Sequence, residues 1–383
     1  MFTPHHKNIT SVWARSQASG AGTTWIEISK SALLFNIRQM RRIAGKAGLM
    51  AVVKANAYGH GMVEVAGIVR GQVDWFGVAG LDEALLLRKS RIRKPVLVLS
   101  YYEKDKTALV FAISRNISFA VYTKLQIHLL DEAARFARRK ARIHLKIDTG
   151  TSRLGIPPGD LGDFLRLIRG AKHLELEGMF SHFADSEGDD KYTKKQLEIF
   201  KRAADRPEFS KALCHIACSA AAIIYPKSRQ DLVRIGIALY GLYSSKKIRT
   251  PLKPVLSWKT RIIQIKELPK GSYVGYGLSY KTKRNTTLAI LPVGYADGYD
   301  RKFSNNAEVL VSGRRCRVVG RVCMNLTMID VTGVPARVGQ EAVLLGRQGR
   351  AEITADELGK RVGTINYEIV TRINWSLPRY VKA

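Results

Sequence analysis

Short apolar runs alternate with longer amphipathic stretches over residues 49–240. The alternation indicates β-strands separated by helices, and therefore a parallel sheet. Helical patterns include Leu81–Lys89, Thr123–Lys140 and Asp189–Asp205. The predicted strands number eight, which predicts a (β/α)8 barrel: Leu49–Val53, Trp75–Ala79, Val96–Ser100, Ile117–Val121, Arg142–Ile147, Leu174–Phe180, Leu213–Cys218 and Val233–Ile237. A doubly wound sheet is the alternative, although no GxGxxG motif follows the first strand.

The pattern changes after Tyr243, where a polar stretch contains the chain breakers Pro251 and Pro254. Strand patterns separated by turns follow, and one helix is expected near Thr354–Arg361. The predicted strands are Val255–Ile265, Thr287–Leu291, Ala307–Val311, Arg315–Gly320, Thr327–Val331 and Glu341–Leu345. We therefore predict a flexible leader (1–21), a barrel (22–250) and a mostly β C-terminal domain (251–383). Thr24–Ile28 is a further predicted strand whose partner could lie in either domain.

Composition is typical of a folded globular protein, and we expect it in the cytoplasm. The chain has 383 residues, of which 46% are hydrophobic, enough for two cores. It has no run of 18 apolar residues, and its N-terminus lacks the apolar segment of a secretion signal. The four cysteines (Cys214, Cys218, Cys316 and Cys323) fit no disulfide scaffold, which suits a reducing compartment. We expect no membrane association and no metal site.

The chain is strongly basic, with 63 Lys and Arg against 32 Asp and Glu and a formal net charge of +31. Basic residues are spread along the chain, and the densest runs, Arg88–Lys94 and Arg135–Arg142, lie at the ends of helical patterns. Zinc-finger, RNP and basic-zipper patterns are absent from the sequence. We predict no specific nucleic-acid partner, although the charge favours nonspecific binding to polyanions.

Lys54 is the first candidate for chemistry. It follows the apolar run Met50–Val53 in the sequence AVVKANAYGHG (residues 51–61). Burial at the end of a strand disfavours an ammonium and lowers its pKa, which suits a lysine that forms a Schiff base with an aldehyde. The alternative is a lysine that extends its ammonium to water.

Other polar residues follow the predicted barrel strands at their C-terminal ends, where barrel active sites lie. They are Lys146, Arg153, His182 and Ser219, while Arg234 lies at the start of the eighth strand, which ends around Gly236 and Ile237. Phosphate groups bind after strands seven and eight in barrels, where the Ser219 hydroxyl and the amides of Gly236 and Ile237 are available. Ser219 could also cap a helix, and both roles can hold together. A reactive lysine beside a phosphate site suggests pyridoxal 5'-phosphate.

These blocks together resemble the alanine racemase family from about Thr24 to Arg379. AVVKANAYGHG resembles that family's cofactor-lysine signature. Further matching blocks are KIDTGTSRLGI (146–156), FSHFA (180–184), VRIGIALYG (233–241), VGYGLSY (274–280), LPVGYADGY (291–299), CMN (323–325) and YEIVTRINWSLPR (367–379). The resemblance implies a pyridoxal-phosphate enzyme, a homodimer with shared active sites, that interconverts L- and D-alanine and supplies D-alanine for peptidoglycan.

The resemblance also implies roles for individual barrel residues. Lys54 matches the Schiff-base lysine, which is also the catalytic base on one face. Arg234 matches the residue facing the pyridine nitrogen, and His182 the histidine that supports it. Arg153 matches the contact to the cofactor phenolate and the substrate carboxylate. Lys146 matches a lysine that is often carbamylated, and Tyr58, Ser219, Gly236 and Ile237 match the phosphate cradle.

The C-terminal domain supplies the remaining matches. Tyr276 matches the base on the opposite face, contributed by the second subunit, and Met324 matches a backbone contact to the substrate carboxylate. Tyr295, Arg301 and Arg321 match the substrate access corridor. Racemisation removes a Cα proton from one face and returns one to the other, so two bases are the minimal solution. Arg234 stays protonated and cannot give its proton to the pyridine nitrogen, which should suppress side reactions.

Three departures from the family pattern bear on cofactor affinity and substrate breadth. They are Cys218 in place of an asparagine, Asn325 in place of an aspartate, and Trp375 where some members have a phosphate-contacting tyrosine. Alternatives are a racemase of broader or serine specificity and an amino-acid decarboxylase on the same barrel. Arg234 and Ser219 oppose the decarboxylase, whose relatives place a carboxylate at the pyridine nitrogen. A non-enzymatic cofactor-binding protein would not need Tyr276.

Overall fold

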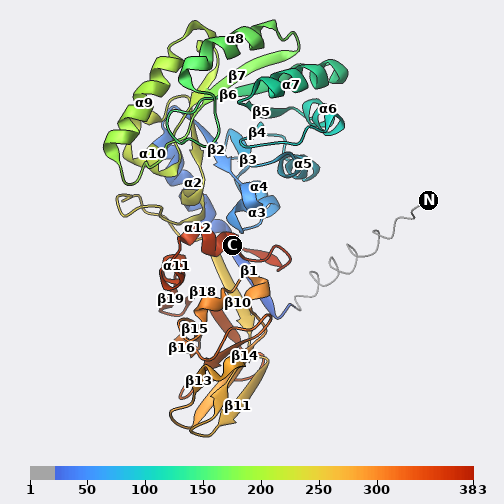
Figure 1. Ribbon diagram of the computed structural model, residues 1–383. Coiled ribbons are helices and arrows are strands. Elements are labelled where there is room, and N and C mark those ends of the chain that lie inside the picture. Colours follow the sequence, from blue (N-terminus) through green and yellow to red (C-terminus); the bar gives the residue numbers. More distant parts are fainter. Residues whose placement is uncertain (1–21) are drawn as a thin grey trace, which may run out of the picture. The chain divides into compact units, whose positions relative to one another are not determined.

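The computed structural model describes residues 22–383, so the expected leader at 1–21 lies outside the described residues. The chain forms two compact units (Figure 1). One is Ser31–Pro254 and the other combines β1 (Thr24–Ser29) with Val255–Ala383. The boundary therefore lies four residues beyond the one expected after residue 250, and residues 24–29 do not belong to the barrel.

The first unit is the predicted barrel of eight parallel strands. Hydrogen-bonded neighbours follow the order β8-β7-β6-β5-β4-β3-β2-β9. Backbone bonds from Asp231 N to Cys214 O (3.1 Å) and from Arg234 N to Ala217 O (3.0 Å) join the two ends of this order. The strands are β2 (Gly48–Val52), β3 (Trp75–Val78), β4 (Val96–Val98), β5 (Ile117–Val121), β6 (Ala141–Lys146), β7 (Leu174–Phe180), β8 (Leu213–His215) and β9 (Leu232–Ile235). Strand β8 ends three residues before the expected Cys218.

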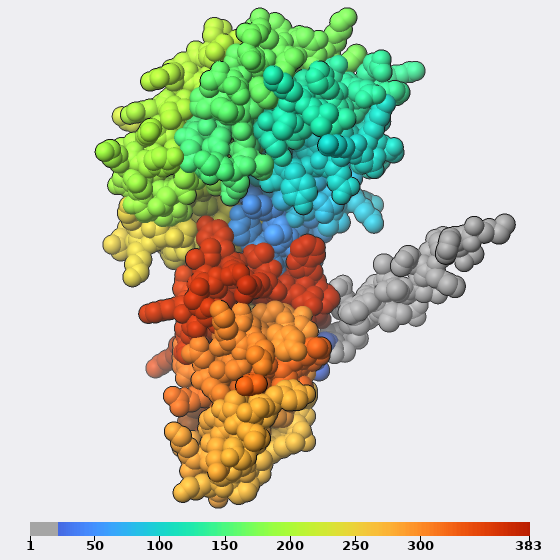
Figure 2. Space-filling view, in the orientation of Figure 1, coloured from blue at the N-terminus to red at the C-terminus, as the bar shows by residue number. Residues whose placement is uncertain are grey.

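Helices cover the outside of the strands, and their side chains form the cyan to yellow-green surface in Figure 2. Helix α8 shows why they pack there, because Leu161, Phe164, Leu165 and Ile168 recur at helical spacing and are buried. Helix α7 begins with a capping box between Thr123 and Gln126. The helices are α2 (Lys30–Ala44), α4 (Met62–Val69), α5 (Leu81–Lys89), α6 (Lys106–Ser114), α7 (Lys124–Ala137), α8 (Leu161–Gly170), α9 (Asp190–Ala204) and α10 (Ser219–Ile224).

The barrel interior has an apolar part and a polar part. Met50, Trp75, Leu97 and Leu232 pack together as a buried cluster. His144 and Lys146 are buried on one face of β6, because side chains repeat every two residues, and the exposed Arg142 precedes them on the same face. Buried polar groups from β6 to β9 therefore gather on one side of the interior, and they include the candidate site.

The second unit is mostly β, as predicted. Its main sheet has the order β11-β14-β17-β16-β15-β18-β10-β1-β20, with β19 paired to β18. Strand β1, whose partner was left open, pairs with β10 and β20. The strands are β10 (Leu256–Arg261), β11 (Gln264–Leu268), β12 (Tyr273–Val274), β13 (Tyr280–Lys281), β14 (Thr286–Leu291), β15 (Glu308–Val311), β16 (Arg314–Val318), β17 (Thr327–Asp330), β18 (Glu341–Gln348), β19 (Ala351–Ile353) and β20 (Arg379–Lys382).

The prediction of a single strand over Val255–Ile265 is wrong in one respect, because the structure has two strands there, β10 and β11. Ile262 N donates to Gln340 O and Ile263 N to Ile290 O, both at 2.9 Å. Consecutive residues thus bond to different segments, the residue before β18 and strand β14, and the chain must bend between them.

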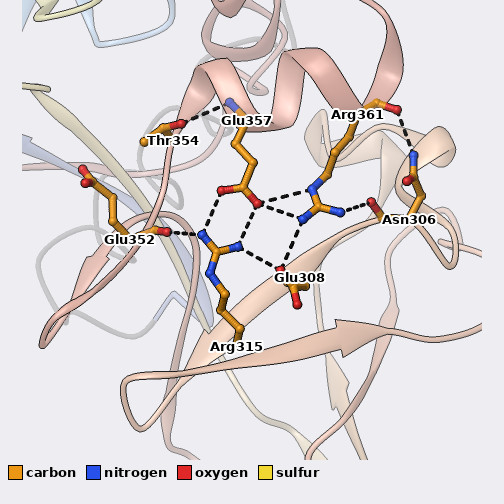
Figure 3. Close-up of polar contacts among 7 residues, drawn as sticks. All are labelled: Asn306, Glu308, Arg315, Glu352, Thr354, Glu357 and Arg361. Carbon is orange, nitrogen blue, oxygen red and sulfur yellow. Dashed lines mark hydrogen bonds and ion pairs between the residues drawn. The ribbon is translucent and has the colours of Figure 1, made fainter.

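Helix α11 (Ala355–Val362), the helix expected near residues 354–361, is held by the ion pairs of Figure 3. Arg315 Nη1 contacts Glu308 Oε2 and Glu357 Oε1, each at 2.8 Å. Arg361 Nη2 contacts the same two carboxylates at 3.2 and 2.9 Å. Two guanidiniums alternating with two carboxylates form a network, which stabilises more than isolated surface pairs do. Helix α12 (Asn366–Thr371) follows. Within residues 22–383, the helices are too short or too polar to cross a bilayer.

Candidate active site

Lys54 lies directly beyond β2, at the C-terminal end of the barrel strands. Its side chain reaches solvent but is surrounded by protein on most sides, and this desolvation is the largest cause that lowers its pKa. The cations of Arg153 and Arg234 lower the pKa further, whereas Glu83 acts in the opposite direction. A larger fraction of neutral amine at neutral pH makes Lys54 a better nucleophile and base than an ordinary surface lysine.

The residues after Lys54 form a left-handed turn. Ala55, Asn56, Ala57 and Tyr58 have φ of 52°, 52°, 54° and 54° within α3 (Lys54–Tyr58). Left-handed backbone costs roughly 1–2 kcal/mol for each non-glycine residue, so other contacts must hold this turn.

Two anchors hold it. Glu83 accepts hydrogen bonds from the amides of Ala55 (2.6 Å) and Ala79 (2.7 Å). The Asn56 side chain accepts from Met62 N at 2.8 Å, where helix α4 begins. The turn fixes the direction in which Lys54 and Tyr58 leave the backbone.

Arg234 on β9 is fully enclosed and multiply hydrogen bonded. Its Nη2 donates to Ser181 O (2.7 Å), Ile216 O (2.9 Å) and His182 Nδ1 (3.1 Å). Its Nη1 donates to His215 Nδ1 (2.8 Å) and to His215 O (3.1 Å). Burial lowers its pKa to about 10, which leaves the guanidinium charged at neutral pH. Burial, and then Arg234, hold the pKa of His182 well below its usual range, so His182 is a neutral acceptor. The structure thus brings Arg234 and His182, which the sequence paired, into hydrogen-bond contact.

Sequence reasoning missed a chain of buried groups behind Arg234. His215 Nε2 lies 3.0 Å from His144 Nδ1, and His144 Nε2 lies 3.2 Å from Glu177 Oε2. The available signal was weak. His144 alternates with Lys146 along β6, and His215 lies two residues beyond Leu213 of the core cluster.

Lys146 and Arg153 occupy the end of β6 and the following loop. Burial is the main cause that lowers the pKa of Lys146 to about 8, followed by Arg234, Arg153 and Lys54. Asp148 organises the loop by accepting from the amides of Gly150 (2.8 Å), Thr151 (2.7 Å) and Arg153 (3.2 Å). This carboxylate fixes the backbone from which the exposed Arg153 side chain extends.

The predicted phosphate residues lie together. Gly236 N donates to Ser219 Oγ at 2.9 Å, and Ile237 follows at the start of a single 3-10 turn. A Cβ at Gly236 would lie 2.6 Å from Tyr58 Oη, so only glycine leaves room for this hydroxyl. Tyr58 lies beside Tyr240, with ring centroids 5.0 Å apart. The site combines two hydroxyls with backbone amides, a donor set suited to a phosphate.

Cys218 does not lie in a strand with Cys214, as the expected Leu213–Cys218 implied. It is extended and immediately precedes helix α10, which begins at Ser219. Its Sγ lies 3.3 Å from Ser186 Oγ. The thiol thus has a hydroxyl partner where the family pattern has an amide.

The remaining predicted residues lie in the second unit, where two pairs of them are close together. Gly277, next to Tyr276, is so close to Arg321 that a Cβ there would lie 2.7 Å from the guanidinium. Tyr295 N donates to Cys323 O at 3.1 Å, beside Met324. Tyr276, Tyr295 and Met324 are 72%, 43% and 57% exposed.

Fold and site together define a class of protein, a (β/α)8 barrel that places a lysine of lowered pKa and a donor set suited to an anion beyond its strands. Family models agree with this class. Residues 28–244 match the alanine racemase N-terminal domain and residues 255–381 match the alanine racemase C-terminal domain. The chain belongs to the alanine racemase family, whose members are isomerases.

Individual relatives cover nearly the whole chain. An alanine racemase from Symbiobacterium thermophilum is 42% identical over 373 residues, which are 94% of this chain and 97% of that one. The structure of an alanine racemase from Clostridium difficile superposes with a TM-score of 0.89 at 35% identity, covering 94% and 96% of the two chains. A histidine racemase from Leuconostoc mesenteroides superposes with a TM-score of 0.88 at 31% identity, covering 95% and 99%. The fold is therefore shared by racemases of different substrates.

Proposed function

We propose that this enzyme interconverts L-alanine and D-alanine with pyridoxal 5'-phosphate, in the cytoplasm, and that the D-alanine serves peptidoglycan synthesis. The observation that carries the proposal is the placement of Lys54 at the barrel rim that also holds Arg234 with His182 and the Ser219–Gly236 cradle. Alanine is the substrate named for the relatives with the highest identity reported above.

The residues of this rim fit the cofactor. Lys54 offers an amine for its aldehyde, and Tyr58, Ser219, Gly236 and Ile237 offer hydroxyls and amides for its phosphate. Arg234 offers a permanent hydrogen-bond donor to a ring nitrogen that carries no proton. When bound, the cofactor withdraws electron density from the substrate Cα and so acidifies its proton.

Two side chains are then assigned to move the Cα proton of the substrate. Neutral Lys54 Nζ takes or returns the Cα proton on one face, and Tyr276 Oη does so on the other. Arg153 holds the substrate carboxylate and fixes which Cα bond faces each base. Met324 adds a backbone contact to the carboxylate, and Tyr295 limits access.

Tyr276 is assigned to the partner subunit of a homodimer. The second unit exposes large apolar side chains that a monomer would leave in water, namely Tyr273, Tyr276, Leu278, Tyr295, Met324 and Trp375. Large exposed apolar side chains are enriched where proteins meet a partner, so we expect these to be covered in a dimer. Glycines at φ 72° and 67° flank Tyr276, and this left-handed backbone would strain any residue with a Cβ.

Substrate choice is expected to favour alanine, with serine slower. Tyr276, Tyr295, Met324 and Trp375 are bulky and reject a long side chain, whereas one added hydroxyl changes binding by only about 1–3 kcal/mol. Purified enzyme with cofactor should be assayed by chiral chromatography against alanine, serine, histidine and lysine. We expect the highest kcat/KM for alanine. Equal or higher kcat/KM for histidine or lysine would contradict this choice and indicate a broad or different specificity.

Lys146 is proposed to be carbamylated by carbon dioxide. Only a neutral amine reacts, and a pKa of about 8 leaves about a tenth of Lys146 neutral at pH 7, roughly 200-fold more than an ordinary lysine. The carbamate would place a negative charge beside Arg153 and Arg234. Enzyme in 13C-bicarbonate should show one carbamate 13C resonance that is lost in Lys146→Gln and kept in the exposed control Lys140→Gln. A spectrum without that resonance would count against carbamylation.

A further inference from the structure

Behind the active-site rim, a buried hydrogen-bonded chain connects Arg234 to Glu177. Arg234 Nη1 lies 2.8 Å from His215 Nδ1, His215 Nε2 lies 3.0 Å from His144 Nδ1, and His144 Nε2 lies 3.2 Å from Glu177 Oε2. Both histidine side chains are fully buried and Glu177 is 15% exposed. Four groups from four neighbouring strands thus run through the polar part of the barrel interior.

The direction of these bonds follows from chemistry. A guanidinium only donates, so Nδ1 of His215 must accept and cannot carry a proton. His215 in its neutral form then carries its proton on Nε2 and donates to Nδ1 of His144. By the same reasoning, His144 carries its proton on Nε2 and donates to the Glu177 carboxylate. Burial, and then Arg234, hold the pKa of His215 well below its usual range, which agrees with a neutral ring.

The surrounding residues leave room for the hydrogen-bonded series from Arg234 to Glu177 and restrain it. A Cβ at Gly178 would lie 2.3 Å from Nδ1 of His144, so glycine is needed to admit this ring. A β-bulge opposite Ile143 and His144 makes Glu177 an extra residue of β7, and bulges change the direction of a side chain. The Phe180 ring stacks on His215 with centroids 5.1 Å apart and planes 3° apart.

The contacts of Glu177 favour the ionised form of its carboxyl group. Its carboxylate accepts from Ser118 Oγ at 2.5 Å, and Arg142 Nη1 lies 3.7 Å from its other oxygen. These contacts together with His144 hold the pKa of Glu177 below its usual value, although burial alone would raise it. In contrast, the polar contacts of Arg234 within residues 22–383 are carbonyl oxygens and histidine nitrogens, without a carboxylate.

We propose that Glu177 is a positioning residue that acts through His144 and His215 to fix the orientation of Arg234. A carboxylate can only accept, so Glu177 at one end and the Arg234 donor at the other favour the same direction of hydrogen bonding, and loss of the carboxylate leaves Arg234 alone to impose it. Because Nδ1 of His215 accepts from Arg234 Nη1, it fixes the plane of the guanidinium. The guanidinium is then held in the orientation that it needs to face the cofactor ring. The inference deepens the proposed function and rests on it for this last consequence.

Glu177→Gln tests the direction of the chain. A glutamine amide has nearly the same shape but can donate as well as accept, so it permits the opposite direction. In that arrangement His215 would carry its proton on Nδ1. Two donors would then face each other, and Arg234 would lose this hydrogen bond. The matched control is Glu175→Gln, which removes a carboxylate of the same strand that also lies near Arg142 (3.8 Å) but contacts neither histidine.

The measurement is 15N NMR of histidine-labelled enzyme, with resonances assigned through His144→Gln and His215→Gln and spectra taken before and after cofactor addition. We expect both histidines to be neutral and protonated on Nε2 in the wild type and in Glu175→Gln. In Glu177→Gln we expect a second tautomer of His215, a shifted absorbance maximum of the bound cofactor, and a fall in kcat of about 10-fold with little change in KM.

A proton on Nδ1 of His215 in the wild type would overturn the proposal without any variant. So would an unchanged His215 tautomer and cofactor spectrum in Glu177→Gln. The tautomers are measured without substrate, so they are independent of the alanine assay that tests the proposed function.

Discussion

Replacing Lys54 with alanine is expected to lower kcat for racemisation in both directions by about 10³-fold or more. The change removes the amine that attaches the cofactor and one of the two proposed bases, and a positioned base alone contributes about 10²–10⁴-fold. Racemisation rates from both alanine enantiomers measure the loss. Lys140→Ala, which removes an exposed lysine just before β6, should keep full activity.

The same prediction has a covalent readout. Wild-type enzyme treated with borohydride should carry the cofactor irreversibly on the peptide that contains Lys54, as shown by mass spectrometry. An adduct on a different lysine, or a Lys54→Ala enzyme with more than a tenth of wild-type kcat, would be incompatible with the assigned role.

The second large effect is expected from Tyr276→Phe, which removes one hydroxyl from an exposed side chain. Loss of a base on one face should slow proton abstraction from L-alanine by about 10²–10⁴-fold while abstraction from D-alanine falls far less. Exchange of the Cα proton of each enantiomer with solvent deuterium measures the two directions separately. Tyr273→Phe, on the adjacent strand β12 and also exposed, is the control and should leave both rates unchanged.

Mixing Lys54→Ala and Tyr276→Phe chains tests whether the site is shared. A hybrid dimer contains one site with both residues intact, so random exchange should restore about a quarter of the wild-type activity. Zero recovery, with subunit exchange verified by native mass spectrometry, would place both bases within one chain.

Much of the fold could be predicted because the relevant signals are local. The barrel strands are short apolar runs separated by helical patterns, and all eight predicted runs overlap the observed strands. Strand β20 was missed because its sequence, RYVK, is polar and half exposed, and only its pairing with β1 makes it a strand. Helix α12 has six residues, too few for a clear helical period.

Site residues could be predicted where the residue type and its position next to an apolar run suggest a chemical role. Lys54 and Ser219 are polar residues that follow apolar runs, and Arg234 is a charged residue inside one, and such placement is visible in the sequence. The left-handed turn at 55–58 was not, because alanine ordinarily favours right-handed helices, and distant Glu83 supplies the restraint. Glu177 was missed because an alternating pattern contains no sign of the bulge that turns its carboxylate toward His144.

The most direct test of the central claim is incubation of the purified enzyme with its cofactor and L-alanine in D2O. The proposed two-base racemisation predicts D-alanine that accumulates to the amount of the L-enantiomer, with deuterium at Cα of the product by chiral chromatography and mass spectrometry. Alanine that stays entirely in the L form, or release of carbon dioxide in place of D-alanine, would contradict it.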